Sequence, residues 1–266
     1  MNKKNIIVPV SYSVFFFMIY ILTNKEISVT ELILRLSFGT FSNHKGFLGE
    51  AIFQYFLIVF AHIIFGSRLF KNFCNATAYF YVRTVNLKRW FFGESINLLI
   101  DIIKFYFINL FSLIGLCLFS RKIYKFEFSD ILFILYFIAL YSMFTFITCI
   151  ILNIISIYAD SGIAFMVVES LNAIFMGFYL ITGDIFTTEY LMDHSYLFKL
   201  NPICHLIIHI HKSNLSIMNK YLIYPLSQTS LSASFIFLLL CTIFVVIAGC
   251  FMIDKMDLIG DKLEGE

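Results

Sequence analysis

The chain has 266 residues, of which 60% are hydrophobic and 14% are charged, and its formal net charge at pH 7 is +2. Because a soluble domain carries roughly 25% charged residues, this composition excludes a soluble globular protein and predicts an all-α polytopic membrane protein. The small net charge gives no indication of nucleic-acid binding. The six cysteines include no CxxC pair and stand mostly in or beside apolar runs, so we expect neither a disulfide bond nor a structural zinc site.

Six apolar runs are long enough to cross a bilayer, and we expect residues 1–266 to form one transmembrane domain. The predicted spans are residues 6–22, 47–66, 90–119, 131–152, 163–182 and 233–251. Lys3 and Lys4 precede the first run as in a signal peptide, but no small-x-small cleavage site follows it. We therefore predict an uncleaved first span, kinked near Pro9, that enters from the cytoplasm.

A basic stretch, residues 67–94, separates the second and third spans. It holds one acidic residue, Glu94, and five basic ones: Arg68, Lys71, Arg83, Lys88 and Arg89. Positive charge beside a span indicates the cytoplasmic side of the membrane. We predict a cytoplasmic coupling helix made of two half-helices, residues 69–77 and 78–85, with Trp90 anchoring the next span at the interface. The alternative is a basic interfacial loop that only sets the topology.

The third predicted span is overlong and carries a polar stripe. About thirty residues make a helix of about 45 Å, whereas the hydrocarbon core is ~30 Å thick. One helical face holds the stripe: Glu94, Asn97, Asp101 and Lys104. Because an ionised group near a span centre costs roughly 2.5–3.5 kcal/mol, this face must meet protein or water. Two interpretations remain open, a conduit or subunit interface, and an Asp101–Lys104 pair inside the bundle.

The fourth and fifth spans hold fewer polar groups. The fourth follows a short exoplasmic turn, and its hydroxyl groups at Tyr141, Thr145 and Thr148 predict close helix packing. An inner loop, residues 153–162, is expected next. The fifth span contains a lone carboxylate, Glu169, with Asn172 nearby. A buried carboxyl group either binds a proton or finds a donor. Lys104 is the expected partner of Glu169, and Glu169 and Asn172 join the predicted conduit or dimer surface.

Residues 183–232 predict two short exoplasmic helices between the fifth and sixth spans. Residues 184–200 are amphipathic, Asn201-Pro202 breaks them, and residues 203–211 are too few to span a membrane. The second piece contains Cys204, His205, His209 and His211. The i,i+4 spacing of His205 and His209 suits a metal site on a helix, but no carboxylate or second cysteine completes a diagnostic set. We expect histidine packing at the interface and no metal.

This layout resembles the permease subunits of type-2 ABC exporters over the whole chain. The resemblance is carried by six spans, by the aromatic and basic segment YFYVRTVNLKRW after the second span, and by Gly183 and Asn201-Pro202 after the fifth. The most similar in size are small Gram-positive permeases that export antimicrobial or toxic peptides or give immunity to them. Larger members carry an amphipathic helix before the first span, whereas about five residues precede it here.

The resemblance implies the transmembrane subunit of an ATP-driven exporter of a hydrophobic or amphipathic peptide, in a bacterial plasma membrane, with both termini cytoplasmic. The chain contains no G-x-x-x-x-G-K-[ST] motif, so we expect no cofactor or enzyme activity on it. ATP and Mg would bind two copies of a separate ATPase subunit, and a second permease, identical or homologous, would complete the complex. The implied ATPase-docking residues are Phe70, Lys71, Phe73, Tyr79, Phe80 and Arg83.

Two other classes stay open. One is a membrane immunity or scaffold protein that does not transport. The other is an intramembrane enzyme, although the chain contains no Glu-Glu pair with a downstream histidine, no G-x-S-x-G and no H-E-x-x-H pattern.

Overall fold

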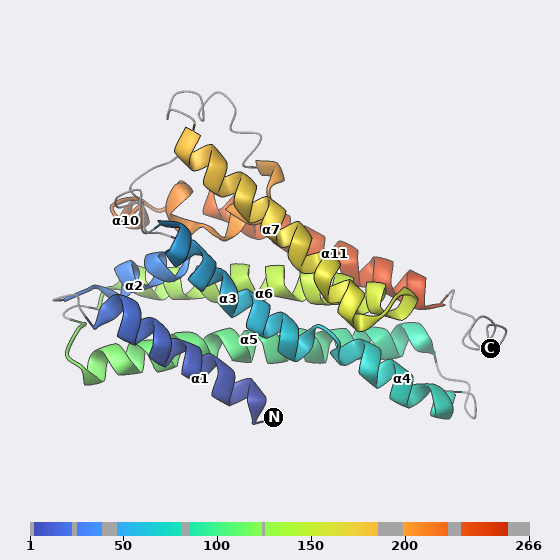
Figure 1. The fold of residues 1–266 in the computed structure, drawn as a ribbon. Coiled ribbons are helices and arrows are strands. Elements are labelled where there is room, and N and C mark those ends of the chain that lie inside the picture. The colour runs from blue at the N-terminus through green and yellow to red at the C-terminus, as the bar shows by residue number, and fades with distance from the viewer. Residues whose placement is uncertain are drawn as a thin grey trace.

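The computed structural model describes residues 3–22, 26–38, 47–80, 86–123, 126–185, 199–222 and 230–254. Within these ranges the chain forms helices and no strand, apart from two isolated bridges that join Ile27 to Ile123 and Lys212 to Ser230. Six of the helices there are long and apolar enough to cross a bilayer, which indicates a multi-pass membrane protein. Figure 1 shows them as an elongated bundle.

The helical elements follow the predicted spans closely. In chain order they are α1 (Lys4–Phe16), η1 (Phe17–Ile21), α2 (Val29–Leu36), α3 (Phe47–Phe65), α4 (Arg68–Phe80), α5 (Leu87–Phe119), α6 (Phe128–Tyr158), α7 (Ser161–Ile185), η2 (Cys204–Leu206), η3 (Ile208–Ile210), α10 (Ser216–Asn219) and α11 (Leu231–Asp254). The six candidate spans lie in α1 with η1, α3 running on into α4, α5, α6, α7 and α11.

One predicted connection is wrong. The inner loop expected at residues 153–162 is nearly absent, because α6 continues to Tyr158 and α7 begins at Ser161. Asp160 makes the change of direction possible, since its side chain accepts a hydrogen bond from the Gly162 N–H at 2.8 Å and so satisfies a free donor at the start of α7. Polar side chains near the end of α6 do not stop the helix, because Ser156 donates back to the Leu152 carbonyl at 2.7 Å.

The most buried of the six spans is α6, and α5, α7 and α11 pack along it. Tyr141 on α6 stacks on Phe137, with ring centroids 4.4 Å apart. The predicted packing role of the threonines is confirmed, since Thr145 lies 2.6 Å from the Tyr106 hydroxyl of α5 and Thr148 lies 2.6 Å from a ring nitrogen of His62 on α3.

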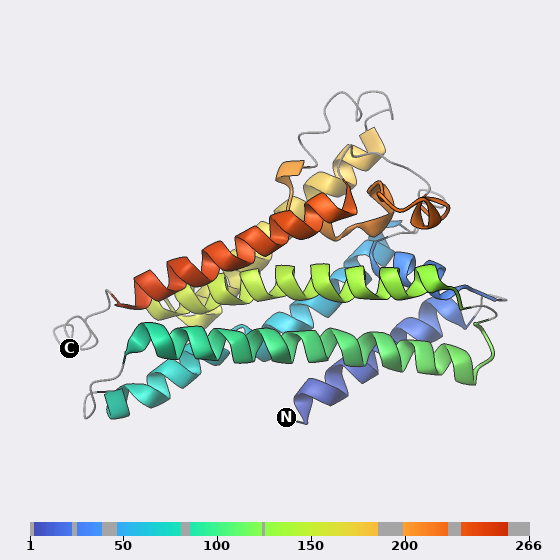
Figure 2. The same cartoon turned by 180° about the vertical axis from the view of Figure 1, so that it is seen from behind.

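The two ends of the bundle differ in what they carry. Figures 1 and 2 show α4 and the end of α11 at one end of the bundle, and α2 and α10 at the opposite end. The first residues of α1 are the ones nearer to α4. We refer to these as the α4 end and the α2 end. The even number of spans places both described termini toward the α4 end.

Candidate functional site

The turn between α3 and α4 fixes where α4 begins. A Cβ at Gly66 would lie 2.4 Å from the His62 carbonyl oxygen and 2.8 Å from Leu152 Cδ1, so a side chain has no room there. The Phe70 backbone N–H, one of the unpaired donors of the first helical turn, donates to Asn153 Oδ1 at 2.9 Å. The start of α4 is therefore anchored on the end of α6.

One face of α4 is attached to the polar stripe of α5. Arg68 Nη1 lies 2.5 Å from Asp101 Oδ2, and Asn72 Nδ2 donates to Glu94 Oε2 at 2.9 Å. Phe73 is buried on the same side, with its ring centroid 6.0 Å from that of Trp90. Lys71 and Cys74 are exposed. Because α4 is held by an ion pair, an amide and an aromatic contact, any displacement of α4 acts on α5.

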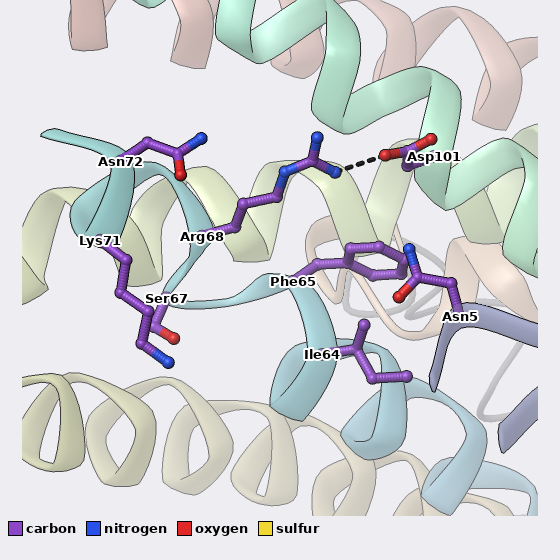
Figure 3. Close-up of a pocket in the computed structure, with 8 residues that line it drawn as sticks. All are labelled: Asn5, Ile64, Phe65, Ser67, Arg68, Lys71, Asn72 and Asp101. Atoms are coloured by element: carbon purple, nitrogen blue, oxygen red, sulfur yellow. Dashed lines mark hydrogen bonds and ion pairs between the residues drawn. The ribbon is translucent and has the colours of Figure 1, made fainter. Parts of the chain in front are cut away.

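A polar cavity of about 430 Å³ lies beside this junction. Figure 3 shows Arg68 extending toward Asp101, while Lys71 extends in another direction. The cavity is lined by residues of α1, α3, the turn, α4 and α5: Asn5, Ile64, Phe65, Ser67, Arg68, Lys71, Asn72 and Asp101. Four helices therefore meet at one charged site.

The four residues of the polar stripe on α5 do not all fit one of the two predicted roles, a conduit or subunit interface and an Asp101–Lys104 pair inside the bundle. The predicted pair of Lys104 and Asp101 forms, but its N–O distance is 3.5 Å, longer than the 2.5 Å from Asp101 to Arg68. Lys104 and Asn97 are exposed, whereas Glu94 and Asp101 face α4. The main partner of Asp101 is thus Arg68 of the basic stretch, a pairing that the sequence analysis did not predict.

The structure corrects the expected shape of the coupling segment. α4 runs without a break across Thr77 and Ala78 to Phe80, so the predicted break between the two half-helices is wrong; residues 81–85 lie outside the described part of the chain. Of the predicted docking residues, Lys71 is exposed, Phe70 is half-buried and Phe73 is buried. The side chains of Tyr79 and Phe80 lie outside the described part of the chain, and so does Arg83.

Glu169 has partners other than the predicted one. Its Oε1 lies 2.5 Å from His62 Nδ1, and its Oε2 accepts a hydrogen bond from the Tyr55 hydroxyl. Lys104 instead binds Asp101. Asn172 is buried close by on α7. Sequence reasoning missed His62 and Tyr55, although a histidine inside an apolar span was an available signal, since ionisable residues there mark functional sites by default.

The histidines at the α2 end pack differently from the prediction. Residues 204–210 form two 3₁₀ turns, so His205 and His209 do not share a face of an α-helix. Instead, Ser234 Oγ lies 2.9 Å from His205 Nδ1 and 2.8 Å from His211 Nε2. The other ring nitrogens lie 3.0 Å and 2.7 Å from the carbonyl oxygens of Lys199 and Ile207. We call residues 199–222 with this cluster the histidine cap.

Burial keeps the cap histidines uncharged. Removal from water lowers the pKa of His205, lowers that of His209 to about 3 and lowers that of His211 to about 4. Within the described residues, no group of three or more His, Cys, Asp or Glu side chains could hold a metal ion. The cluster is a hydrogen-bonded contact between the cap and α11, in which the single hydroxyl hydrogen of Ser234 donates to only one of the two ring nitrogens at a time.

No protein-family model, curated protein or solved structure matches this chain.

Proposed function

We propose that the protein is the transmembrane subunit of an ATP-driven exporter that moves a hydrophobic or amphipathic peptide out of a bacterial cell, with α4 as its coupling helix. The observation that carries the proposal is the attachment of α4. A basic helix at one end of the bundle is bound on one face through Arg68–Asp101, Asn72–Glu94 and Phe73–Trp90, and exposes Lys71 on another. A loop that only set the topology would need none of these contacts.

The arrangement of the two ends supports this orientation. Arg68 and Lys71 lie at the α4 end, toward which both described termini point, and basic residues beside spans favour the cytoplasm. The α4 end would then be cytoplasmic, and α2, α10 and the histidine cap would lie on the exoplasmic side.

In this proposal the work comes from a separate pair of ATPase subunits that bind ATP and Mg. Their closure would move α4, and the contacts at Asp101 and Glu94 would pass the motion to α5. Since α5 is one unbroken helix of 33 residues, it carries the displacement along the whole bundle. Asn153 passes the same motion to α6. A second permease would face this one, and the exposed Asn97 and Lys104 are available for that surface.

The exposure of each proposed docking residue indicates whether it would touch the ATPase directly or hold α4 in place. Lys71 and Phe70 would touch the ATPase directly, because their side chains are exposed or half-exposed. Phe73 would act by holding α4 in place, because its ring is packed against Trp90.

Purification of the tagged protein from its native membrane tests the proposal. We expect an ATPase with a P-loop to copurify in equal amount and to hydrolyse ATP faster in the complex. Lys71→Glu should weaken the complex at least tenfold, because it places an opposite charge at the docking face. Lys220→Glu is the matched control, since Lys220 is exposed at the α2 end. The absence of an ATPase, or equal behaviour of the two variants, would favour an immunity or scaffold protein.

A further inference from the structure

A second polar cluster lies where α3, α6 and α7 meet. Its members are Tyr55, His62, Thr148 and Glu169, and we call it the midspan cluster, because Tyr55 lies near the middle of α3 and Glu169 near the middle of its span; His62 lies less than one turn before the end of α3 at Phe65. The side chain of His62 is fully buried, with Nδ1 2.5 Å from Glu169 Oε1 and Nε2 2.6 Å from Thr148 Oγ1. The Tyr55 hydroxyl donates to Glu169 Oε2.

The bonds of Thr148 determine which atoms of the cluster carry hydrogen. Thr148 Oγ1 lies 3.0 Å from the carbonyl oxygens of both Phe144 and Thr145, and a carbonyl can only accept. We assign the hydroxyl hydrogen to these carbonyls, as is usual for threonine within a helix, so that Oγ1 accepts from His62 Nε2–H. Since Nε2 and the Tyr55 hydroxyl both donate, one proton remains on the line between His62 Nδ1 and Glu169 Oε1.

With this one proton the cluster is neutral overall. It is either an imidazolium beside a carboxylate or an imidazole beside a carboxylic acid. Among the described residues, no lysine or arginine forms an ion pair with Glu169. The titratable groups that face Glu169 are Tyr55 and His62 from α3, and Cys149 from α6. The charge of the cluster is therefore set by its own protons.

Glu169 is the member that can exchange a proton with its surroundings. Its side chain is 16% exposed, whereas that of His62 is 0% exposed. Its helix, α7, lies at the edge of the bundle in both Figure 1 and Figure 2. The opposite face of α7 is apolar and exposed, with Ile163, Leu171 and Ile174. The bonds from Glu169 to Tyr55 and His62 tie this outer helix to α3.

We propose that the midspan cluster is a proton-binding site that controls how tightly α7 is held against α3. Uptake of one proton from water converts the Glu169 carboxylate to a carboxylic acid and leaves His62 as an imidazolium, and no bond between heavy atoms forms or breaks. The net charge of the cluster changes from 0 to +1. The charge-assisted bond from Nδ1–H to Oε1 loses its anionic acceptor, so α7 is held less firmly. The inference does not depend on the exporter function.

Infrared difference spectroscopy of the full-length protein in lipid nanodiscs tests proton binding directly, because a carboxylic acid and a carboxylate absorb at different frequencies. On acidification from about pH 9 to about pH 4, a carboxylic acid band should grow in the wild-type protein, and Glu169→Gln should lack only the part of it that Glu169 contributes, because other carboxyl groups among the 17 Asp and Glu residues also begin to protonate near pH 4. The control is Glu31→Gln, since Glu31 is a partly exposed carboxylate of α2 that pairs with Arg35. This variant should keep the band.

Tyr55→Phe separates a proton-binding site from a fixed structural tie, and it also decides the question should Glu169→Gln not fold. Loss of the hydroxyl removes a donor to the charged carboxylate, so the midpoint of the band should move to higher pH by about one unit or more. Spin labels at Phe60 of α3 and Ile174 of α7, both exposed, should move apart through the same midpoint. A band in Glu169→Gln equal to that of the wild type, an unmoved midpoint in Tyr55→Phe, or a distance that does not change with pH would each overturn the proposal.

Discussion

Acidification should open the histidine cap, and the structure sets the size of the effect. His211 has its pKa lowered from 6.5 to about 4, and His209 from 6.5 to about 3. Both values are lowered by burial, so the open cap binds protons more readily than the closed one. Stability of the closed cap is therefore complete above about pH 6.5 and is lost as the pH falls toward 4.

Each of the two histidines raises the population of the open cap about tenfold for every pH unit in this window. Between pH 6.5 and pH 4, His211 alone contributes a factor of roughly 100, or about 3 kcal/mol. His209 adds a similar amount over the same range. Together these changes approach the whole stability of a small domain, which is about 5–15 kcal/mol.

Cys204 reports the opening, because its side chain is 2% exposed in the closed cap. A dipyridyl disulfide reacts with thiols at acid pH and can be followed by absorbance, with the exposed Cys74 as the internal reference. We expect Cys204 to be protected at pH 7 and to react rapidly below about pH 5. His211→Gln should lower the pH dependence of the reaction. A Cys204 rate that, relative to Cys74, stays constant from pH 7 to pH 4 would refute the reasoning.

Two further predictions concern the α4 junction. Asp101→Asn and Arg68→Gln should each lower the thermal stability of the purified protein by about 1–3 kcal/mol, because each leaves a partly buried partner without its counter-charge. The double variant should recover part of the loss, and Lys104→Met should be nearly neutral. Strictly additive effects of the two single changes would contradict this coupling. Gly66→Ala should shift α4 or lower the folded yield, because its Cβ meets the His62 backbone. The control Gly93→Ala has nothing within 4 Å of its Cβ and should be neutral or slightly stabilising. Equal melting temperatures for the two variants would show that the turn adapts.

The spans were predictable because length and apolarity are properties of single segments. The ends of α6 were not, since Ser156 and Asn153 satisfy their polar atoms inside the protein and the helix continues past them. Spacing along one helix placed Glu94 and Asp101 on a common face, and the structure confirms that both receive α4.

Partners on other helices could not be derived in this way. The contact between Glu169 and His62 joins residues 107 positions apart, and no spacing rule indicates which faces of two spans meet. The prediction that His205 and His209 share one helical face was wrong for another reason. The i,i+4 argument assumed an α-helix, whereas residues 204–210 form 3₁₀ turns, and the pair that meets is His205 and His211.

The unequal lengths of the helices have a consequence for the choice of membrane. The first span, Lys4–Ile21, has 18 residues and extends about 27 Å, while α5, with 33 residues, extends about 50 Å. A hydrocarbon layer of about 30 Å is thus slightly thicker than the first span and much thinner than α5. Long helices accommodate such mismatch by tilting, but a short one must draw the lipid inward or shift along its axis. Because Asn5 at the start of α1 lines the cavity that also contains Arg68 and Asp101, bilayer thickness acts on the same junction that holds α4.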